Sequence, residues 1–179
     1  MEISDEKYML EVKNGNLDSM VPLFDRYNVK IYNFFLRLTR NKEISEDLTQ
    51  NVFCRIISYK SSFQNESKFR PWIYQMARNV NIDHYHKNKF VMKDIELEES
   101  IFNDGPDAFE EMEKQEKYKA LKEAISQLNL EQQELIELSR FQGLKYEEIS
   151  EITGNSVGAL KVKFHRAMNK LREHYFELV

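Results

Sequence analysis

Two stretches of the chain combine cations with the side chains that bind nucleic acids. In the first, "KFRPWIYQMARNVNIDHYHKNK" (68–89), aromatic residues alternate with lysine and arginine. Aromatic faces stack on single-stranded bases while nearby cations hold phosphates. In the second, "NSVGALKVKFHRAMNK" (155–170), small residues precede Lys161 and Arg166. A helix that begins with small residues fits closely into a DNA major groove, where its cations reach base edges or phosphates.

Catalytic patterns are missing from the sequence. It contains no Gly-rich phosphate loop and no G-x-S-x-G turn. His84 and His86 stand two residues apart with Cys54 far away, which is not the ligand spacing of a zinc site. The carboxylates before the second basic stretch are most simply the solvated face of a helix: Glu147, Glu148 and Glu151. We therefore expect neither an enzyme nor a cofactor or metal.

The net charge of −4 hides an alternation of charge along the chain. Residues 68–93 hold six basic residues against one acidic, and 156–174 hold five against one. Between them, residues 94–116 hold ten acidic residues against one basic and include the turn "NDGPD". Because nucleic-acid affinity follows local positive surface, we expect two basic domains, 1–93 and 117–179, around an acidic linker, 94–116.

The elements that must position these residues are helices. Only 5 Gly and 3 Pro interrupt the chain, charged residues make up 31%, and no strand-like alternation occurs. Apolar residues recur every three or four positions, with Ser45 expected to cap a helix and Pro71 to lie in a first turn. The stripes cover residues 17–38, 44–56, 69–80, 118–128 and 135–141. The predicted fold is all-α: two small helical domains joined by an acidic linker.

The end of the chain, "EEISEITGNSVGALKVKFHRAMNKLRE" (147–173), is typical of a helix-turn-helix. Gly154 permits a left-handed turn and Ser156 caps the following helix. One side of that helix is apolar, and the opposite side holds Gly158, Val162, His165, Arg166 and Asn169, with Lys161 and Lys163 flanking it. A solvated helix pair with a basic face is the alternative interpretation.

Other features point to a reducing compartment. The one cysteine, Cys54, cannot form an intramolecular disulfide, and in "NVFCRII" we expect it to be buried. Trp72 falls on an apolar stripe and is expected in the core rather than as a stacking platform.

No apolar run approaches the roughly 18 residues of a membrane span, and the acidic start is unlike a signal peptide. We expect a cytoplasmic protein without membrane insertion.

Read in order, these segments resemble the extracytoplasmic-function (group IV) sigma factors of bacterial RNA polymerase, in the sigma-70 superfamily. The resemblance spans about residues 16–175 and rests on "LDSMVPLFDRY", "SEDLTQNVFCRI", "KFRPWIYQMARNVNIDHYHK" and the C-terminal segment from "AISQLNLEQQELIELSRF" onward. The C-terminal part alone is similar to many helix-turn-helix regulators. "EDLTQNVF" followed by F-x-x-W-I-Y-x-x-A-R-N-x-x-x-D is more specific.

The resemblance implies a sigma domain 2 at 1–93 and a sigma domain 4 at 117–179, which bind the largest subunits of core RNA polymerase and promoter DNA. Core contact is implied for Asp47, Leu48, Gln50, Asn51 and Phe53. Recognition and melting of the minus-10 element, including a flipped base, is implied for Asn65, Ser67, Lys68, Arg70, Asn79, Asp83, His86 and Lys87. Reading of the duplex minus-35 element is implied for Ser156, Gly158, Lys161, Val162, His165 and Arg166.

Departures from the family limit what carries over. Many relatives have Arg where His86 stands and a Thr-Val-x-Ser run where this chain has Ala159, Leu160 and Val162, so no promoter sequence is implied. No long extra C-terminal domain is present, so sensing is expected in a separate anti-sigma factor. The alternative is a free-standing regulator whose N-terminal bundle binds a ligand or dimerises. A regulator binds duplex DNA unaided, a sigma factor needs core polymerase, and a mere helical interaction module does neither.

Overall fold

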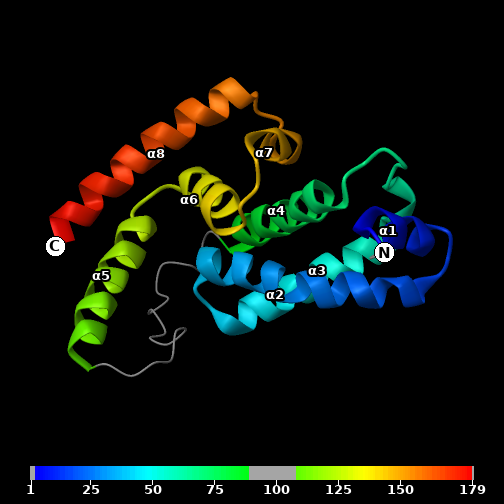
Figure 1. The fold of residues 1–179 in the computed structure, drawn as a ribbon, viewed down its shortest axis with the longest axis horizontal. Coiled ribbons are helices and arrows are strands. Elements are labelled where there is room, and N and C mark those ends of the chain that lie inside the picture. The colour runs from blue at the N-terminus through cyan, green and yellow to red at the C-terminus, as the bar shows by residue number, and fades with distance from the viewer. Residues whose placement is uncertain (1–2, 89–107, 179) are drawn as a thin grey trace. The chain divides into compact units, whose positions relative to one another are not determined.

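The computed structural model describes residues 3–88 and 108–178, and within those two ranges all regular structure is helical (Figure 1). The all-α prediction is confirmed. The chain divides into two compact units, with α1 to α4 in the first and α5, α6 and α8 in the second. The helices are α1 (Asp5–Lys13), α2 (Met20–Thr39), α3 (Lys42–Ser58), α4 (Phe69–Asn88), α5 (Ala108–Ser126), α6 (Leu130–Ile136), α7 (Tyr146–Thr153) and α8 (Val157–Leu178).

Short turns connect several of these helices: η1 (Leu17–Ser19), η2 (Lys60–Ser62) and the π-helical η4 (Glu137–Phe141). None of the described helices has the combination of length and apolar content that crossing a membrane requires. Residues 94–107 of the expected acidic linker lie outside the described ranges. The remaining part, from Ala108 onward, is the start of α5.

In the first unit, α2, α3 and α4 pack side by side around one apolar core (Figure 1). Phe34 lies at its centre, with ring centroids 5.3 Å from Phe35 and 6.0 Å from Tyr74. Fully buried side chains come from all three helices, among them Ile31, Val52, Ile56 and Ile73. Each such side chain stabilises the fold by about 1.5–3 kcal/mol, so the predicted stripes of these helices are what holds the unit together.

Helix α1 is an element that the sequence analysis did not predict. Ser4 caps it by accepting the N–H of Lys7 at 3.3 Å, and Met9 and Val12 are fully buried. Its first residue, Asp5, pairs with Arg26 at 2.5 Å and accepts the hydroxyl of Tyr27 at 2.6 Å. Nine residues with only two buried side chains give too short a stripe to recognise, although Ser4 before two acidic residues was a usable capping signal.

Two predictions for α3 are wrong. Its cap is Asn41, whose Oδ1 accepts the N–H of Ile44 at 2.9 Å, whereas Ser45 lies buried inside the helix and donates to the Asn41 carbonyl at 2.6 Å. Asparagine caps as well as serine does, and it precedes Ser45. Cys54 is exposed rather than buried, because α3 turns Val52 and Ile56 into the core.

In the second unit α8 packs against α5 and α6. Asn129 and Gln132 form a capping box that begins α6, each side chain accepting the other's backbone N–H, at 2.9 and 3.2 Å. Buried side chains along these helices form the core: Ala124, Leu128, Leu135, Leu138, Leu160, Phe164 and Leu171. Four residues of the predicted apolar stripes are exposed instead of buried: Leu17 at 49%, Phe24 at 45%, Tyr118 at 40% and Phe141 at 42%.

The contact between Tyr27 and Asp5 predicts a pH dependence of stability. Burial, reinforced by the hydrogen bond to Asp5, raises the pKa of Tyr27 above its ordinary value of 10.0. Tyr27→Phe should lower the free energy of unfolding at neutral pH by about 1.5–3 kcal/mol, the contribution of a hydrogen bond to a charged acceptor. Urea unfolding of both proteins measures this difference.

The same difference should shrink as pH rises above 10.0, because Tyr27 ionises in the unfolded chain before it does so in the folded one. Tyr8→Phe is the control: Tyr8 meets Arg26 through its ring face, which phenylalanine keeps. A difference between parent and Tyr27→Phe that stays constant up to pH 11.5 would contradict this account.

Candidate nucleic-acid interface

Helices α7 and α8 form the predicted helix-turn-helix. Between them Gly154 has φ +74°, the left-handed conformation that glycine adopts without strain. Ser150 of α7 donates to the Asn155 carbonyl at 2.7 Å, and the Ser156 hydroxyl accepts the N–H of Ala159 at 3.2 Å. The turn is therefore fixed from both sides, and α8 starts with small side chains.

One face of α8 is committed to the core of its unit, and the opposite face is open. Leu160, Phe164 and Ala167 are buried. The structure brings the predicted minus-35 residues together on the exposed side of the helix: Ser156, Gly158, Lys161, Val162, His165 and Arg166. Val162 is an apolar side chain with 51% exposure among cations, a combination that suits a groove presenting phosphates and thymine methyl groups.

Lys163, the other cation expected at the edge of that face, has a different role. Its Nζ lies 2.5 Å from Glu131 Oε1 and 3.0 Å from Asn155 Oδ1. It thus ties the turn before α8 to the start of α6 and is only partly available to an anion. Sequence reasoning missed this because the partner Glu131 is 32 residues away.

In the first unit α4 presents a polar face opposite its buried stripe. Asn79, Asp83 and His86 recur at spacings of four and three, so they lie along one exposed line, with Lys87 exposed beside it. Asp83 pairs with Arg55 of α3 at 2.8 Å across a half-exposed surface. Burial lowers the pKa of the neighbouring His84, which at neutral pH adds no charge to this face.

The connection between α3 and α4 is a closed loop with an exposed tip. Phe63 is fully buried, and the N–H of Ser67 donates to the Gln64 carbonyl at 3.0 Å. Asn65 and Lys68 are exposed, whereas Ser67 and Arg70 are half-buried. The ring of the half-buried Trp72 lies 5.1 Å from that of Phe63 and 6.1 Å from that of Phe69, under the loop.

The five residues predicted to contact the polymerase do not form one surface. Leu48 and Phe53 are only 7% exposed, and the Phe53 ring packs 4.8 Å from that of Phe24. Asp47, Gln50 and Asn51 are exposed on the opposite side of α3. Because both side chains are buried, Leu48 and Phe53 belong to the core side of α3.

The open face of α3 holds two more residues that sequence reasoning did not assign to it, Cys54 and Ile57, the latter 41% exposed. Ile57 continues the spacing of Gln50 and Cys54, which was the available signal. Within 3–88 and 108–178 no three His, Cys, Asp or Glu side chains come together as a metal site requires.

Comparison with known proteins finds two family matches. Residues 23–91 match the model for sigma-70 region 2, and residues 118–171 match that for sigma-70 region 4. The chain is 30% identical over 161 residues to RNA polymerase sigma factor YlaC of Bacillus subtilis, covering 88% of this chain and 92% of that protein. It is 28% identical over 187 residues to ECF RNA polymerase sigma factor SigW of the same organism, covering 99% and 100%.

A solved structure has a similar fold. Sigma factor RpoE from Bartonella quintana, crystallised with the anti-sigma factor NepR, aligns with a TM-score of 0.67 at 20% identity, covering 87% of this chain and 95% of that one. At 20% identity this alignment shows only that the two folds are similar.

Gly158 lies at the start of the open face of α8, and replacing it with alanine should change stability and DNA affinity in opposite directions. No atom lies within 4 Å of a Cβ added there, so Gly158→Ala should raise the free energy of unfolding by about 0.5–1 kcal/mol. If this end of α8 enters a major groove, the same methyl group should weaken binding to a target duplex several-fold. Thermal unfolding of the free protein measures the first effect, and duplex binding by its complex with core RNA polymerase measures the second.

Gly154→Ala is the control. It also meets no atom within 4 Å, but its φ of +74° should make alanine destabilising by about 1–2 kcal/mol. Unchanged DNA affinity of a stabilised Gly158→Ala protein would mean that this end of α8 stays clear of the groove.

Proposed function

The chain belongs to the extracytoplasmic-function sigma factors of the sigma-70 family, and on this premise we propose that it binds core RNA polymerase and directs it to specific promoters. The observation that carries the proposal is that one chain holds both matched regions. Each region also has an exposed polar helix face, on α4 and on α8, that is suited to DNA. The protein performs no chemistry itself, because RNA synthesis belongs to the polymerase. Its place of action is then the cytoplasm, where the polymerase works.

The open face of α8 reads the minus-35 element in the major groove of duplex DNA. Arg166 and Lys161 reach guanine edges or phosphates, and Val162 contacts a thymine methyl group. Ser156 and the positive end of the α8 dipole hold a backbone phosphate. Gly158 and the neighbouring small residues allow the close approach, while His165 lies at the centre of the face.

The first unit recognises the minus-10 element after its strands separate. The exposed tip of the loop presents Asn65, with Ser67 beside it, to an unpaired base, while Lys68 and Arg70 hold the phosphates of that strand. The line of Asn79, Asp83, His86 and Lys87 on α4 continues the same surface. Support comes from the exposure of Asn65, of Lys68 and of the line on α4, and from the aromatic rings under the loop.

Polymerase contact is assigned to the open face of α3. The exposed Asp47, Gln50 and Asn51 provide the polar contacts of this face, whereas Leu48 and Phe53 hold the helix in place from the buried side. For the acidic residues of 94–116 the proposal is a charge that imitates nucleic acid near the RNA exit channel of the polymerase.

Activity is held in check by an anti-sigma factor. The support is that RpoE of Bartonella quintana, with a similar fold, was solved bound to such a protein. A free-standing helix-turn-helix regulator is the other class of function, and the two matched sigma-70 regions do not favour it. The two proposals differ in their expectation for DNA binding: a regulator occupies duplex sites without polymerase, whereas a sigma factor needs core polymerase.

The double change Asp47→Ala with Gln50→Ala tests the polymerase contact. Both side chains are exposed on α3, so the fold should remain intact while affinity for core polymerase falls about tenfold or more, near 1.4 kcal/mol. Competition between parent and variant for a limiting amount of core measures the change, and circular dichroism checks the fold.

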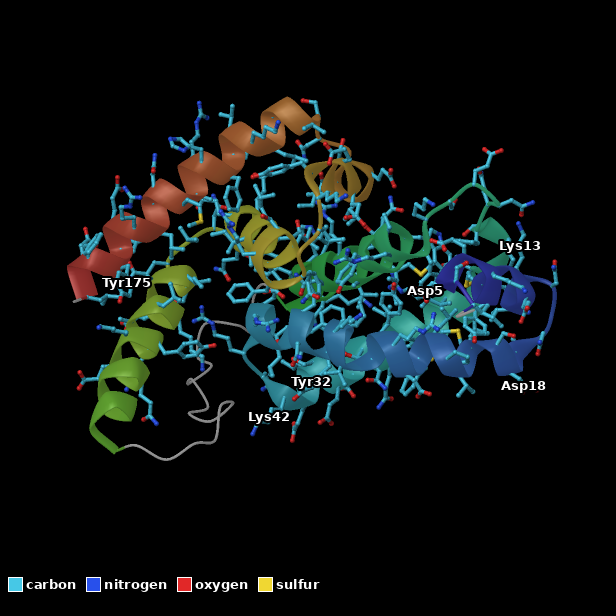
Figure 2. All side chains as sticks on the ribbon, viewed as in Figure 1. Asp5, Lys13, Asp18, Tyr32, Lys42 and Tyr175 are labelled. Carbon is cyan, nitrogen blue, oxygen red and sulfur yellow. The ribbon has the colours of Figure 1, made fainter. Side chains whose placement is uncertain are left out.

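The matched control is Asn14→Ala with Asp18→Ala, an exposed amide and acid at the α1–α2 connection of the same unit. Figure 2 places Asp18 at the opposite end of the unit from Lys42, where α3 begins. The control should bind core as the parent does. Equal binding by all three proteins would mean that α3 does not dock on the polymerase.

A further inference from the structure

Helix α1 holds both ends of the loop between α3 and α4. Lys13 Nζ donates to the Phe63 carbonyl at 2.5 Å, where the chain enters the loop. The N–H of Phe69, where α4 begins, donates to Glu6 Oε1 at 3.3 Å. Glu6 and Lys13 are seven residues apart, two helical turns, so they project from the same face of α1. In Figure 2 Lys13 lies at the end of α1 that faces this loop.

Between these two anchors the loop is closed at its base and open at its tip. Phe63 and Phe69 are fully buried with ring centroids 6.3 Å apart. Phe69 also packs edge-on against Tyr27 at 5.2 Å, and Tyr27 donates to Asp5 of α1. The tip residues Asn65 and Lys68, in contrast, have exposed side chains. Fixing the two ends of the loop therefore limits the conformations available to its tip.

Both α1 contacts involve a charged side chain and a backbone group. Hydrogen bonds to a charged partner are shorter and stronger than neutral ones. A carboxylate beside the first N–H groups of α4 is further stabilised by the helix dipole. The region 2 match begins at residue 23, so α1 lies outside the part of the chain that this family model matches.

We propose that Lys13 and Glu6 are positioning residues for recognition of the unpaired minus-10 base. They hold the loop in the conformation that binds the base, so less conformational freedom is lost on binding. The inference rests on the proposed function of the loop. What this inference adds is that base selectivity at the minus-10 element depends on α1, a helix that does not contact the base.

Polymerase holoenzyme made with the full-length Lys13→Met variant tests this on a forked promoter whose minus-10 strand is already unpaired. Affinity for the fork should fall about 3- to 10-fold, the cost of ordering a loop, and the preference for one base at the captured position should flatten. Binding to core polymerase and to duplex minus-35 DNA should not change. Lys13→Arg keeps a donor and should restore affinity and preference.

Lys7→Met is the matched control, since Lys7 is an exposed lysine on the same helix. Unaltered base preference in the Lys13→Met holoenzyme would overturn the inference. So would a Lys13→Met protein that loses core binding and fork binding in equal measure, because that is loss of folding.

Hydrogen exchange of the free protein separates this inference from the proposed function. Amides 64–68 should exchange faster in Lys13→Met than in the parent or in Lys7→Met, and equal exchange overturns the bracing role whatever the fork shows. If exchange rises as expected but the parent holoenzyme shows no base preference on the fork, the proposed function of the loop is wrong, and the positioning role falls with it.

Discussion

Burial of a single apolar stripe on each of α3, α4 and α8 determines which residues remain for polymerase and DNA. On α8 the commitment of Leu160 and Phe164 to the core turns Val162 and Arg166 to solvent. On α3 the burial of Leu48 turns Asp47 outward. The binding faces need no stabilisation of their own, because 3.6-residue periodicity places them opposite a core that is already stable.

Most of this arrangement could be predicted from sequence, since long stripes are strong signals. The helix-turn-helix, with Gly154 and Ser156 at its turn, is as expected. Predictions that depend on single positions along a helix were wrong: α3 is capped by Asn41 and not by Ser45, and Cys54 is exposed and not buried. The short α1 escaped notice because most of its side chains are polar and its support comes from Arg26, Tyr27 and the loop, partners distant in sequence.

The count of charges along the chain also misses contacts between residues that are distant in sequence. It credits every lysine and arginine in a basic stretch to nucleic acid, yet Lys163 is held by Glu131 and Asn155. On α4, Asp83 is drawn toward Arg55, so its negative charge is partly offset on the face assigned to DNA. Tertiary ion pairs thus redistribute the field that local composition suggests, and only the folded chain reveals which cations stay available.

Transcription by purified core RNA polymerase on a library of genomic promoter fragments, with and without this protein, tests the central claim most directly. The account predicts discrete start sites that appear only when core and protein are both present, with permanganate-reactive thymines marking an opened minus-10 region at each. Specific binding to duplex sites in the absence of core, together with no new start sites in its presence, would contradict it and would identify a free-standing regulator instead.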